Sequence, residues 1–162
     1  MDVKIKTENQ NFKFRVNILI LHNNKILLEE LNNNGFLSLP GGHVQLGEST
    51  REAAVREATE EVGLLSENQK LIAIIENFFK SKNGENFHEL SFYYLMEMKD
   101  VPDEKSRDYI YIENDEGKLV HHDFRWINIE KANDYDIRPT PLKSILKDKK
   151  FEFSHYVVKN KS

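Results

Sequence analysis

The feature that most constrains the fold is one strong helix signal, residues 50–62, set between β-rich stretches. Ser49 or Thr50 fits the N-cap position, Glu52 lies where a capping box needs it, and Gly63 is a natural residue to end the helix. The narrow apolar stripe of this helix consists of Ala53, Ala54, Ala58 and Val62. Because such a stripe must be buried, we expect the helix to pack against a sheet.

Alternation of apolar and polar residues predicts the strands of that sheet. Asn23-Asn24 predicts a two-residue hairpin turn, since Asn tolerates positive φ. Residues 141–147 resemble a short helix, and the tail after it is expected to pack back as a strand. The predicted strands are residues 12–22, 25–31, 36–39, 71–80, 87–98, 109–112, 118–120 and 124–129. The sequence therefore predicts an α/β (α+β) fold with a mixed, curved sheet.

Length and composition exclude several classes of protein. A chain of 162 residues predicts a single domain over 1–162. Its net charge of −4 argues against a DNA-binding protein, and the lack of cysteine excludes disulfide scaffolds, thiolate zinc sites and cysteine nucleophiles. No apolar run is long enough to span a bilayer, and the N-terminal residues show no secretory signal. We expect a cytoplasmic protein with no membrane partner.

The predicted helix carries a cluster of carboxylates. Glu57, Glu60 and Glu61 stand at i, i+3 and i+4, so they share one helical face. A charge run taken alone is usually a solvated face, yet these three like charges repel and would be stabilised by a cation. Oxygen ligands without sulfur or clustered imidazole favour Mg²⁺, Mn²⁺ or Ca²⁺ over zinc. Since Mg²⁺ often bridges carboxylates and substrate phosphates, the cluster indicates phosphate chemistry.

A glycine-bearing loop, Pro40-Gly41-Gly42, precedes this helix. Glycine lets the backbone approach a ligand closely and offers its carbonyl groups to a metal. Arg56 cannot point in the same direction as its neighbour Glu57, so we interpret it as an orienting partner for Glu48 or another nearby carboxylate.

The stretch 42–64 resembles the motif of the Nudix hydrolases, G-x5-E-x7-R-E-U-x-E-E-x-G-U, where U is a bulky aliphatic residue. Ala58 is smaller than the usual U residue, which is the one departure. The matching positions are Gly42, Glu48, Arg56, Glu57, Ala58, Glu60, Glu61, Gly63 and Leu64. The resemblance implies an α/β/α sandwich in which a loop–helix–loop motif is embedded in the mixed curved sheet.

The resemblance also implies an activity: metal-dependent hydrolysis of a phosphoanhydride in a nucleoside diphosphate linked to another moiety. Ordinary or modified nucleoside triphosphates, ADP-ribose and other nucleotide conjugates are the candidate small-molecule substrates. The implied cofactor is Mg²⁺, with Mn²⁺ as an alternative. The implied metal ligands are Glu57, Glu60, Glu61 and the Gly41 carbonyl. Glu57 is the first choice for the base that takes a proton from water, with Glu48, Arg56 and Glu60 as the other catalytic residues.

Several residues outside the helix remain candidates. Arg15 and Asn17 share a face of the first strand and, with Gly42, are the expected substrate contacts, although an exposed strand face is the alternative. His121 and His122 are neighbours on a predicted strand, so they point oppositely and are expected to be ordinary surface histidines. Members of the resembled family recruit a further base or ligand from a distant loop. The acidic candidates for it are Glu104, Glu113, Asp115, Glu116 and Asp123.

Two other functions stay open at this stage. Some relatives hydrolyse the 5′ end of RNA, but RNA affinity depends on phosphate neutralisation, and the net charge of −4 weighs against it. Other relatives sense a nucleotide without cleaving it, which a loss of motif glutamates would signal; none is lost here. The sequence leaves the assembly open, with a homodimer as one expectation.

Overall fold

The computed structural model describes residues 1–63, 68–149 and 151–160. Its described strands form one sheet in the order β7-β8-β3-β2-β6-β5-β9, with β1 and β4 also pairing with β2. Strands β2 and β6 are parallel, as are β5 and β9, while the remaining pairs are antiparallel. The predicted mixed sheet is confirmed.

The elements follow one another along the chain with short connections. The strands are β1 (Lys4–Lys6), β2 (Gln10–His22), β3 (Lys25–Leu31), β4 (Gly41–His43), β5 (Lys70–Lys80), β6 (Asn86–Glu97), β7 (Tyr109–Asp115), β8 (Lys118–Asn128) and β9 (Ser154–Lys159). The helices are α1 (Thr50–Val62), the 3₁₀ segments η1 (Asp103–Lys105) and η2 (Ile129–Asp134), and α2 (Pro141–Lys147). No helix within the described ranges is long and apolar enough to cross a membrane.

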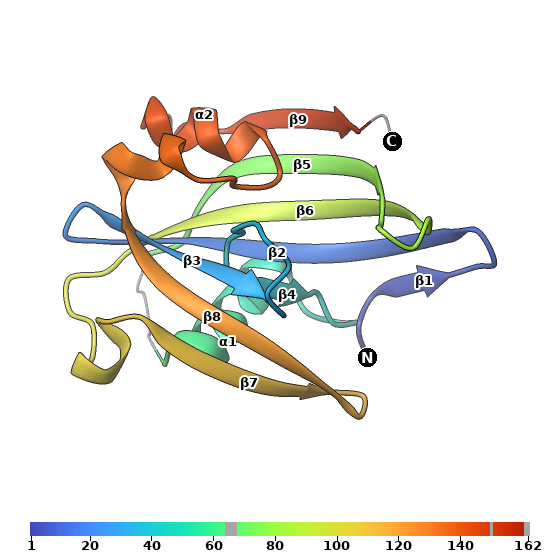
Figure 1. Cartoon of the computed structure of the whole chain (residues 1–162), viewed down its shortest axis with the longest axis horizontal. Coiled ribbons are helices and arrows are strands. Elements are labelled where there is room, and N and C mark those ends of the chain that lie inside the picture. The colour runs from blue at the N-terminus through green and yellow to red at the C-terminus, as the bar shows by residue number, and fades with distance from the viewer. Residues whose placement is uncertain (64–67, 150, 161–162) are drawn as a thin grey trace.

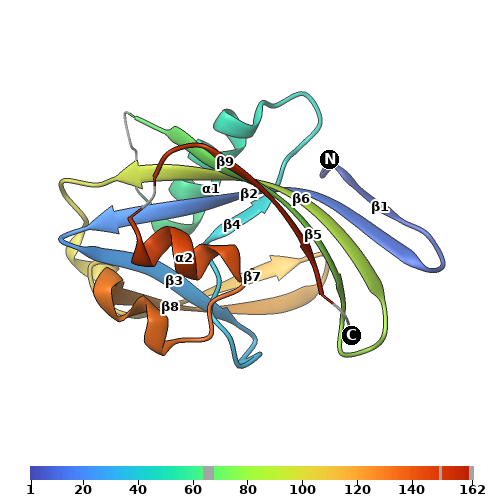
Figure 2. The same cartoon turned by 90° about the horizontal axis from the view of Figure 1, so that it is seen from above.

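Two hydrophobic clusters lie on opposite faces of the sheet. Ile18 of β2 packs in the cluster that contains the apolar stripe of α1, whereas Leu19, the next residue, packs in the cluster that contains α2. Figures 1 and 2 show the two helices on different sides of the sheet, with α2 crossing in front of β2 and β3 when the molecule is seen from above. The helix–sheet–helix layers of the expected α/β/α sandwich are therefore present.

The segment before α1 is inserted between β2 and β3. These two strands pair only next to their turn, at Leu21–Ile26 and His22–Lys25, and then diverge. Farther along, β4 pairs with residues 15–17 of β2, and Ser38 forms an isolated bridge with Glu29 of β3. The motif loop is thus part of the sheet, and it delivers α1 to one face (Figure 1).

Local sequence signals set the ends of α1. The Ser49 hydroxyl accepts a hydrogen bond from the Glu52 amide, and the Glu52 carboxylate accepts one from the Ser49 amide, which completes a capping box. Gly63 ends the helix in the left-handed region, at φ 72°. The predicted bounds of residues 50–62 are confirmed.

Three sequence interpretations of strands need correction. Residues 36–39 were expected to form a strand, but Leu37 and Ser38 make only isolated bridges, and the strand begins at Gly41. The pieces 118–120 and 124–129 are one continuous strand, β8, because backbone pairing with β3 and β7 carries it through polar residues. The sequence also gave no signal for β1, a three-residue strand of exposed residues.

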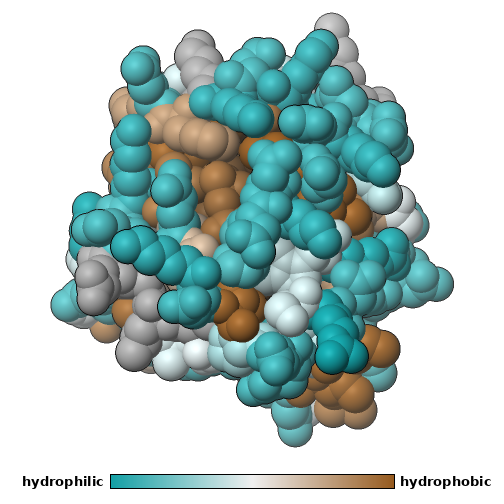
Figure 3. All heavy atoms as spheres, turned by 90° about the vertical axis from the view of Figure 1, so that its left-hand side faces the viewer, coloured by the Kyte–Doolittle hydropathy of each residue, from teal (hydrophilic) through white to brown (hydrophobic). Residues whose placement is uncertain are grey.

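An open hollow of about 290 Å³ lies at the end of the sheet where β2 turns into β3. Apolar atoms reach the surface between polar side chains on this side of the molecule (Figure 3). The lining residues are Leu21, His22, Asn23, Asn24, Glu97, Met98, Ile129, Lys149 and Phe151. None of them is a predicted site residue, so the hollow is separate from the motif.

Replacing the N-cap tests how much the capping box contributes. The Ser49→Ala variant should lower the free energy of unfolding by about 1 kcal/mol, because the Glu52 amide loses its acceptor. Urea unfolding followed by circular dichroism measures this loss. Ser144→Ala, an exposed change inside α2, is the control and should leave stability nearly unchanged. Equal effects in both variants would contradict the capping role.

Candidate active site on helix α1

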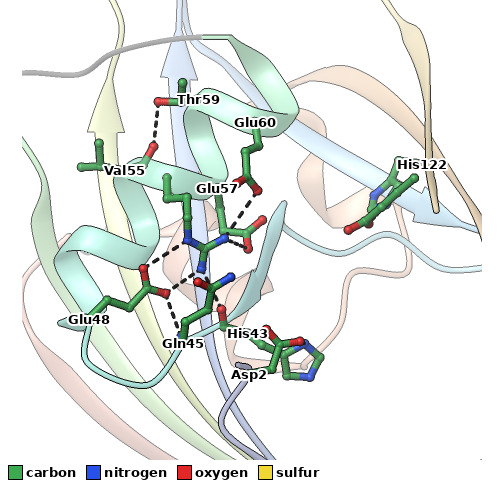
Figure 4. A network of polar contacts seen from close by, with 11 residues as sticks. Asp2, His43, Gln45, Glu48, Val55, Glu57, Thr59, Glu60 and His122 are labelled. Carbon is green, nitrogen blue, oxygen red and sulfur yellow. Dashed lines mark hydrogen bonds and ion pairs between the residues drawn. The ribbon is translucent and has the colours of Figure 1, made fainter. Parts of the chain in front are cut away.

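The Arg56 guanidinium joins α1 to the loop before it. Its Nε lies 3.1 Å from Glu48 Oε2, and its Nη2 lies 2.6 Å from Glu48 Oε1, so the pair is bidentate. The same Nη2 donates to the His43 carbonyl at 3.0 Å, and Nη1 donates to Glu57 at 2.8 Å and to Glu60 at 3.4 Å. Figure 4 shows Glu48, Glu57 and Glu60 converging around this centre. Arg56 therefore contacts Glu48, the partner named for it from the sequence, and its orienting role stays a prediction.

Glu57 is held in place by packing as well as by charge. A Cβ atom on Gly42 would lie 2.1 Å from Glu57 Oε1, so the carboxylate occupies the space that any side chain at position 42 would need. Burial raises the pKa of Glu57, although the hydrogen bond from Arg56 opposes this shift. The carboxyl group therefore sits in a fixed, poorly solvated position next to the glycine loop.

Glu61 lies on the buried side of α1 among other acidic groups. Only 4% of the residue is exposed, and its Oε2 has no hydrogen-bond partner in the described structure. Burial raises the pKa of Glu61 well above its ordinary value, and the carboxylates of Glu29 and Glu57 raise it further. This arrangement leaves an excess of negative charge that a cation would neutralise.

The three predicted metal ligands do not converge on one point. In the described ranges, the group of three metal-type ligands whose atoms lie within 4.8 Å of one another is Glu29, Glu61 and His122. Glu60 is exposed and, like Glu57, is directed to Arg56. Because like charges repel and Arg56 is the nearest cation, two of the three glutamates are drawn away from the third.

His122 was expected on the surface, and this expectation is wrong. It is only 4% exposed, and its two ring nitrogens lie 2.7 Å from Glu29 Oε2 and 2.9 Å from Glu113 Oε2. The hydrogen bonds and charges of these carboxylates raise the pKa of His122, overcoming the effect of burial. His121, its neighbour, is exposed as expected. His122 belongs to strand β8, and Figure 4 shows it to one side of the hydrogen-bond network around Arg56 on helix α1.

Sequence reasoning also missed Glu29, which is 1% exposed on β3. Glu29 and Glu30 stand together before the last residue of β3, and the sequence alone does not distinguish a buried glutamate there from an exposed one. Pairing of β3 with β8 aligns Glu29 with Phe124 and Leu31 with His122, which places Glu29 and His122 on one face. The register between β3 and β8 depends on contacts between residues that are distant in the sequence. Local patterns in one sequence therefore do not predict it.

The predicted substrate contacts have structural partners of their own. Asn17 is buried and donates from Nδ2 to the Leu39 carbonyl at 3.3 Å, so its side chain ties β2 to the motif loop. Burial opposes the charge of Arg15, but Glu89 and Glu29 outweigh it and raise the pKa of Arg15. A Cβ on Gly41 would lie 2.1 Å from the Val16 carbonyl oxygen, so Gly41 allows β4 to approach β2.

Of the five distant acidic candidates, Glu113 is the one that hydrogen-bonds within the cluster around Glu61. Glu116 lies in the β7–β8 turn and pairs with Lys4, while Asp123 pairs with Arg125. Asp115 ends β7, and Glu104 is exposed in η1. The last motif residue, Leu64, lies outside the described residues.

Comparison with known proteins identifies the family of this chain. The model of the NUDIX domain family matches residues 12–148. An ADP-ribose pyrophosphatase from Methanocaldococcus jannaschii is 32% identical over 124 residues, which cover 68% of this chain and 72% of that protein. The chain therefore belongs to the Nudix family, and it is an enzyme of the hydrolase class that acts on pyrophosphate bonds.

Solved structures share the fold at lower sequence identity. A MutT protein from Bacillus halodurans has a TM-score of 0.65 at 16% identity, with 90% of each chain covered. An Ap4A hydrolase from C. elegans has a TM-score of 0.53 at 19% identity, covering 84% of this chain and 94% of that one. Since both identities are low, these structures define the fold of the chain and leave its substrate open.

The Arg56–Glu48 pair should give stability a specific dependence on pH. Arg56 hydrogen bonds lower the pKa of Glu48, so the pair stabilises the folded state above about pH 4.5 and loses this effect as pH falls through the lowered value. Glu48→Gln should cost about 1–2 kcal/mol at pH 7 and much less near about pH 3.5. Urea unfolding at both pH values measures the difference.

Glu8→Gln, at an exposed position, is the matched control and should have little effect at either pH. An equal loss of stability for Glu48→Gln at both pH values would mean that the charge of Glu48 is not the cause.

Removing the charge of Glu61 should stabilise the metal-free protein. Glu61→Gln relieves repulsion from Glu29 and Glu57, so we expect a gain of about 1 kcal/mol, or about 2–4 °C in Tm. Thermal unfolding in the presence of a chelator measures it, with the exposed Glu130→Gln as the control. A lower Tm for Glu61→Gln would show that the carboxylate is not strained by its neighbours.

Proposed function

We propose that this protein is a divalent-metal-dependent hydrolase that cleaves the phosphoanhydride of a nucleoside diphosphate linked to another moiety. The observation that carries the proposal is the burial and the surroundings of two motif glutamates, Glu57 and Glu61. Glu57 lies between Arg56 and Gly42, while the buried Glu61 has an oxygen with no hydrogen-bond partner in the described parts of the chain. Such an arrangement is costly for folding and is explained by a function that needs both carboxylates.

The residues present fit a divalent cation. The orphaned Oε2 of Glu61 needs a positive partner, and the motif supplies oxygen donors, which suit Mg²⁺ or Mn²⁺. Glu57, Glu60, Glu61 and the Gly41 carbonyl are the proposed ligands of the ion, which requires the carboxylates of Glu57 and Glu60 to exchange their contacts with Arg56 for the metal. When bound, the ion would polarise the phosphoryl oxygens and lower the pKa of a bound water.

The other residues of the chain have roles that follow from their contacts. Glu57, whose pKa burial raises, is the proposed base that takes the proton from the attacking water. Arg56 and Glu48 position Glu57 through the hydrogen-bond network, and Glu60 contacts the same guanidinium. Glu113 is the proposed distant acidic residue, because it hydrogen-bonds to His122 and its charge contributes to the raised pKa of Glu61.

The proposed substrate is a small nucleotide, with ADP-ribose as the first candidate. Support comes from the M. jannaschii relative, which carries the name ADP-ribose pyrophosphatase at 32% identity. Arg15 and Asn17 of β2, with Gly42 of β4, are the proposed substrate contacts, and Arg15 supplies a positive charge suited to phosphate. One domain over residues 1–162, a cytoplasmic location and a homodimer stay predictions.

The test is hydrolysis of a nucleotide panel by the purified protein with Mg²⁺ or Mn²⁺, with products separated by chromatography. ADP-ribose should yield AMP and ribose 5-phosphate. Glu61→Gln should lower kcat by about 100-fold or more, since the metal loses a ligand. Glu130→Gln, far from the motif in sequence and exposed, should retain activity.

Two results would contradict the proposal. Undiminished activity in Glu61→Gln would exclude Glu61 as a required ligand. Absence of turnover on ADP-ribose, nucleoside triphosphates and other conjugates, with either metal, would exclude the hydrolase assignment to this substrate class.

A further inference from the structure

Glu29, Glu61 and His122 form a buried cluster that the Nudix motif does not define. One ligand-type atom from each lies within 4.8 Å of the others, and the exposed fractions are 1%, 4% and 4%. The three side chains come from β3, α1 and β8. The β3–β8 register places Glu29 and His122 on one face of the sheet, so the cluster is built by the central fold and not by a loose surface loop.

A structural role explains only part of the cluster. The hydrogen bonds of His122 to Glu29 and Glu113 satisfy the imidazole ring and link strand β8 to β3 and β7. They do not account for Glu61 Oε2, which is buried beside these hydrogen bonds and has no hydrogen-bond partner among the described residues. A carboxylate oxygen that is removed from water normally has a hydrogen-bond donor or a cation beside it. The missing partner is therefore the feature that needs explanation.

The donor atoms favour one type of cation. Two carboxylates and one imidazole nitrogen differ from the all-oxygen environment that Mg²⁺ prefers. Imidazole suits first-row transition metals, whose affinity for such sites rises from Mn²⁺ towards Cu²⁺. A divalent ion would also compensate the charges of Glu29 and Glu61.

We propose that Glu29, Glu61 and His122 form a binding site for a divalent first-row transition-metal ion, beside the motif glutamates. Glu29 and His122 are then metal ligands outside the motif, and Glu61 is shared with it. The ring nitrogen that faces Glu29, Nδ1, is the ligand, and the ring releases its proton on binding.

Glu113 has a distinct part in this site. It accepts the hydrogen bond from His122 Nε2 at 2.9 Å, and its side chain is 45% exposed. A carboxylate on the second nitrogen of a metal-bound histidine fixes the orientation of the ring and raises its basicity. Glu113 is therefore a positioning residue of the site.

This inference rests on the proposed function only through the shared residue Glu61, and its test uses no nucleotide. The untagged protein is stripped of metal, titrated with Mn²⁺ alone and measured by pulsed electron paramagnetic resonance, which detects nitrogen bound to Mn²⁺. The expected result is a nitrogen signal from one imidazole in the wild type. His122→Gln should abolish that signal, while His121→Gln, at the exposed neighbouring position, should retain it.

Glu29→Gln provides a second measurement that keeps the imidazole. It should weaken binding of the nitrogen-coordinated Mn²⁺ by about tenfold or more, and it decides the question if His122→Gln does not fold. No nitrogen signal in the wild type with Mn²⁺ bound would overturn the proposal. So would a signal that persists in folded His122→Gln, or an unchanged Mn²⁺ affinity in Glu29→Gln. Failure to hydrolyse any nucleotide would contradict the proposed function and leave these metal-binding results unaffected.

Discussion

The arrangement of the site depends on the guanidinium of Arg56. It ties Glu48 of the loop, the His43 carbonyl of β4, and two glutamates of α1 into one network. Five donors in a rigid fork can satisfy these acceptors together, which a lysine could not do. Without this cation, helix α1 would present its acidic residues to one another and to the sheet without compensation. Arg56 thus links the segment before α1 to the helix, next to the packing of Val44 against the apolar stripe of α1.

Local sequence patterns were sufficient to predict the helix ends and the tight turn, because interactions between neighbouring residues determine them. The bounds of α1, its caps, and the β2–β3 turn, where Asn23 and Asn24 both have positive φ, follow from nearest-neighbour chemistry. The roles of Glu29 and His122 could not be predicted, because only the pairing of β3 with β8 brings them together. The continuous β8 was missed for the same reason, since its polar residues are held in a strand by partners distant in the sequence.

The site also shows how charge and stability compete. Glu57 and Glu61 are buried although burial raises the pKa of both, so the folded protein keeps two carboxylates in an unfavourable environment. Gly42 adds a steric requirement, because a side chain at position 42 would displace the Glu57 carboxylate from its present place. Elsewhere the capping box and the two apolar clusters supply the stabilisation that makes this arrangement tolerable.

The β7–β8 hairpin contributes His122 and Glu113, whereas helix α1 contributes Glu61. Strand β7 is at the edge of the described sheet and pairs only with β8. Substitutions in this hairpin would therefore change the proposed ligands around Glu61 while every residue of helix α1 stays the same. Two proteins with identical motif residues would then bind different ions because of residues in the β7–β8 hairpin alone.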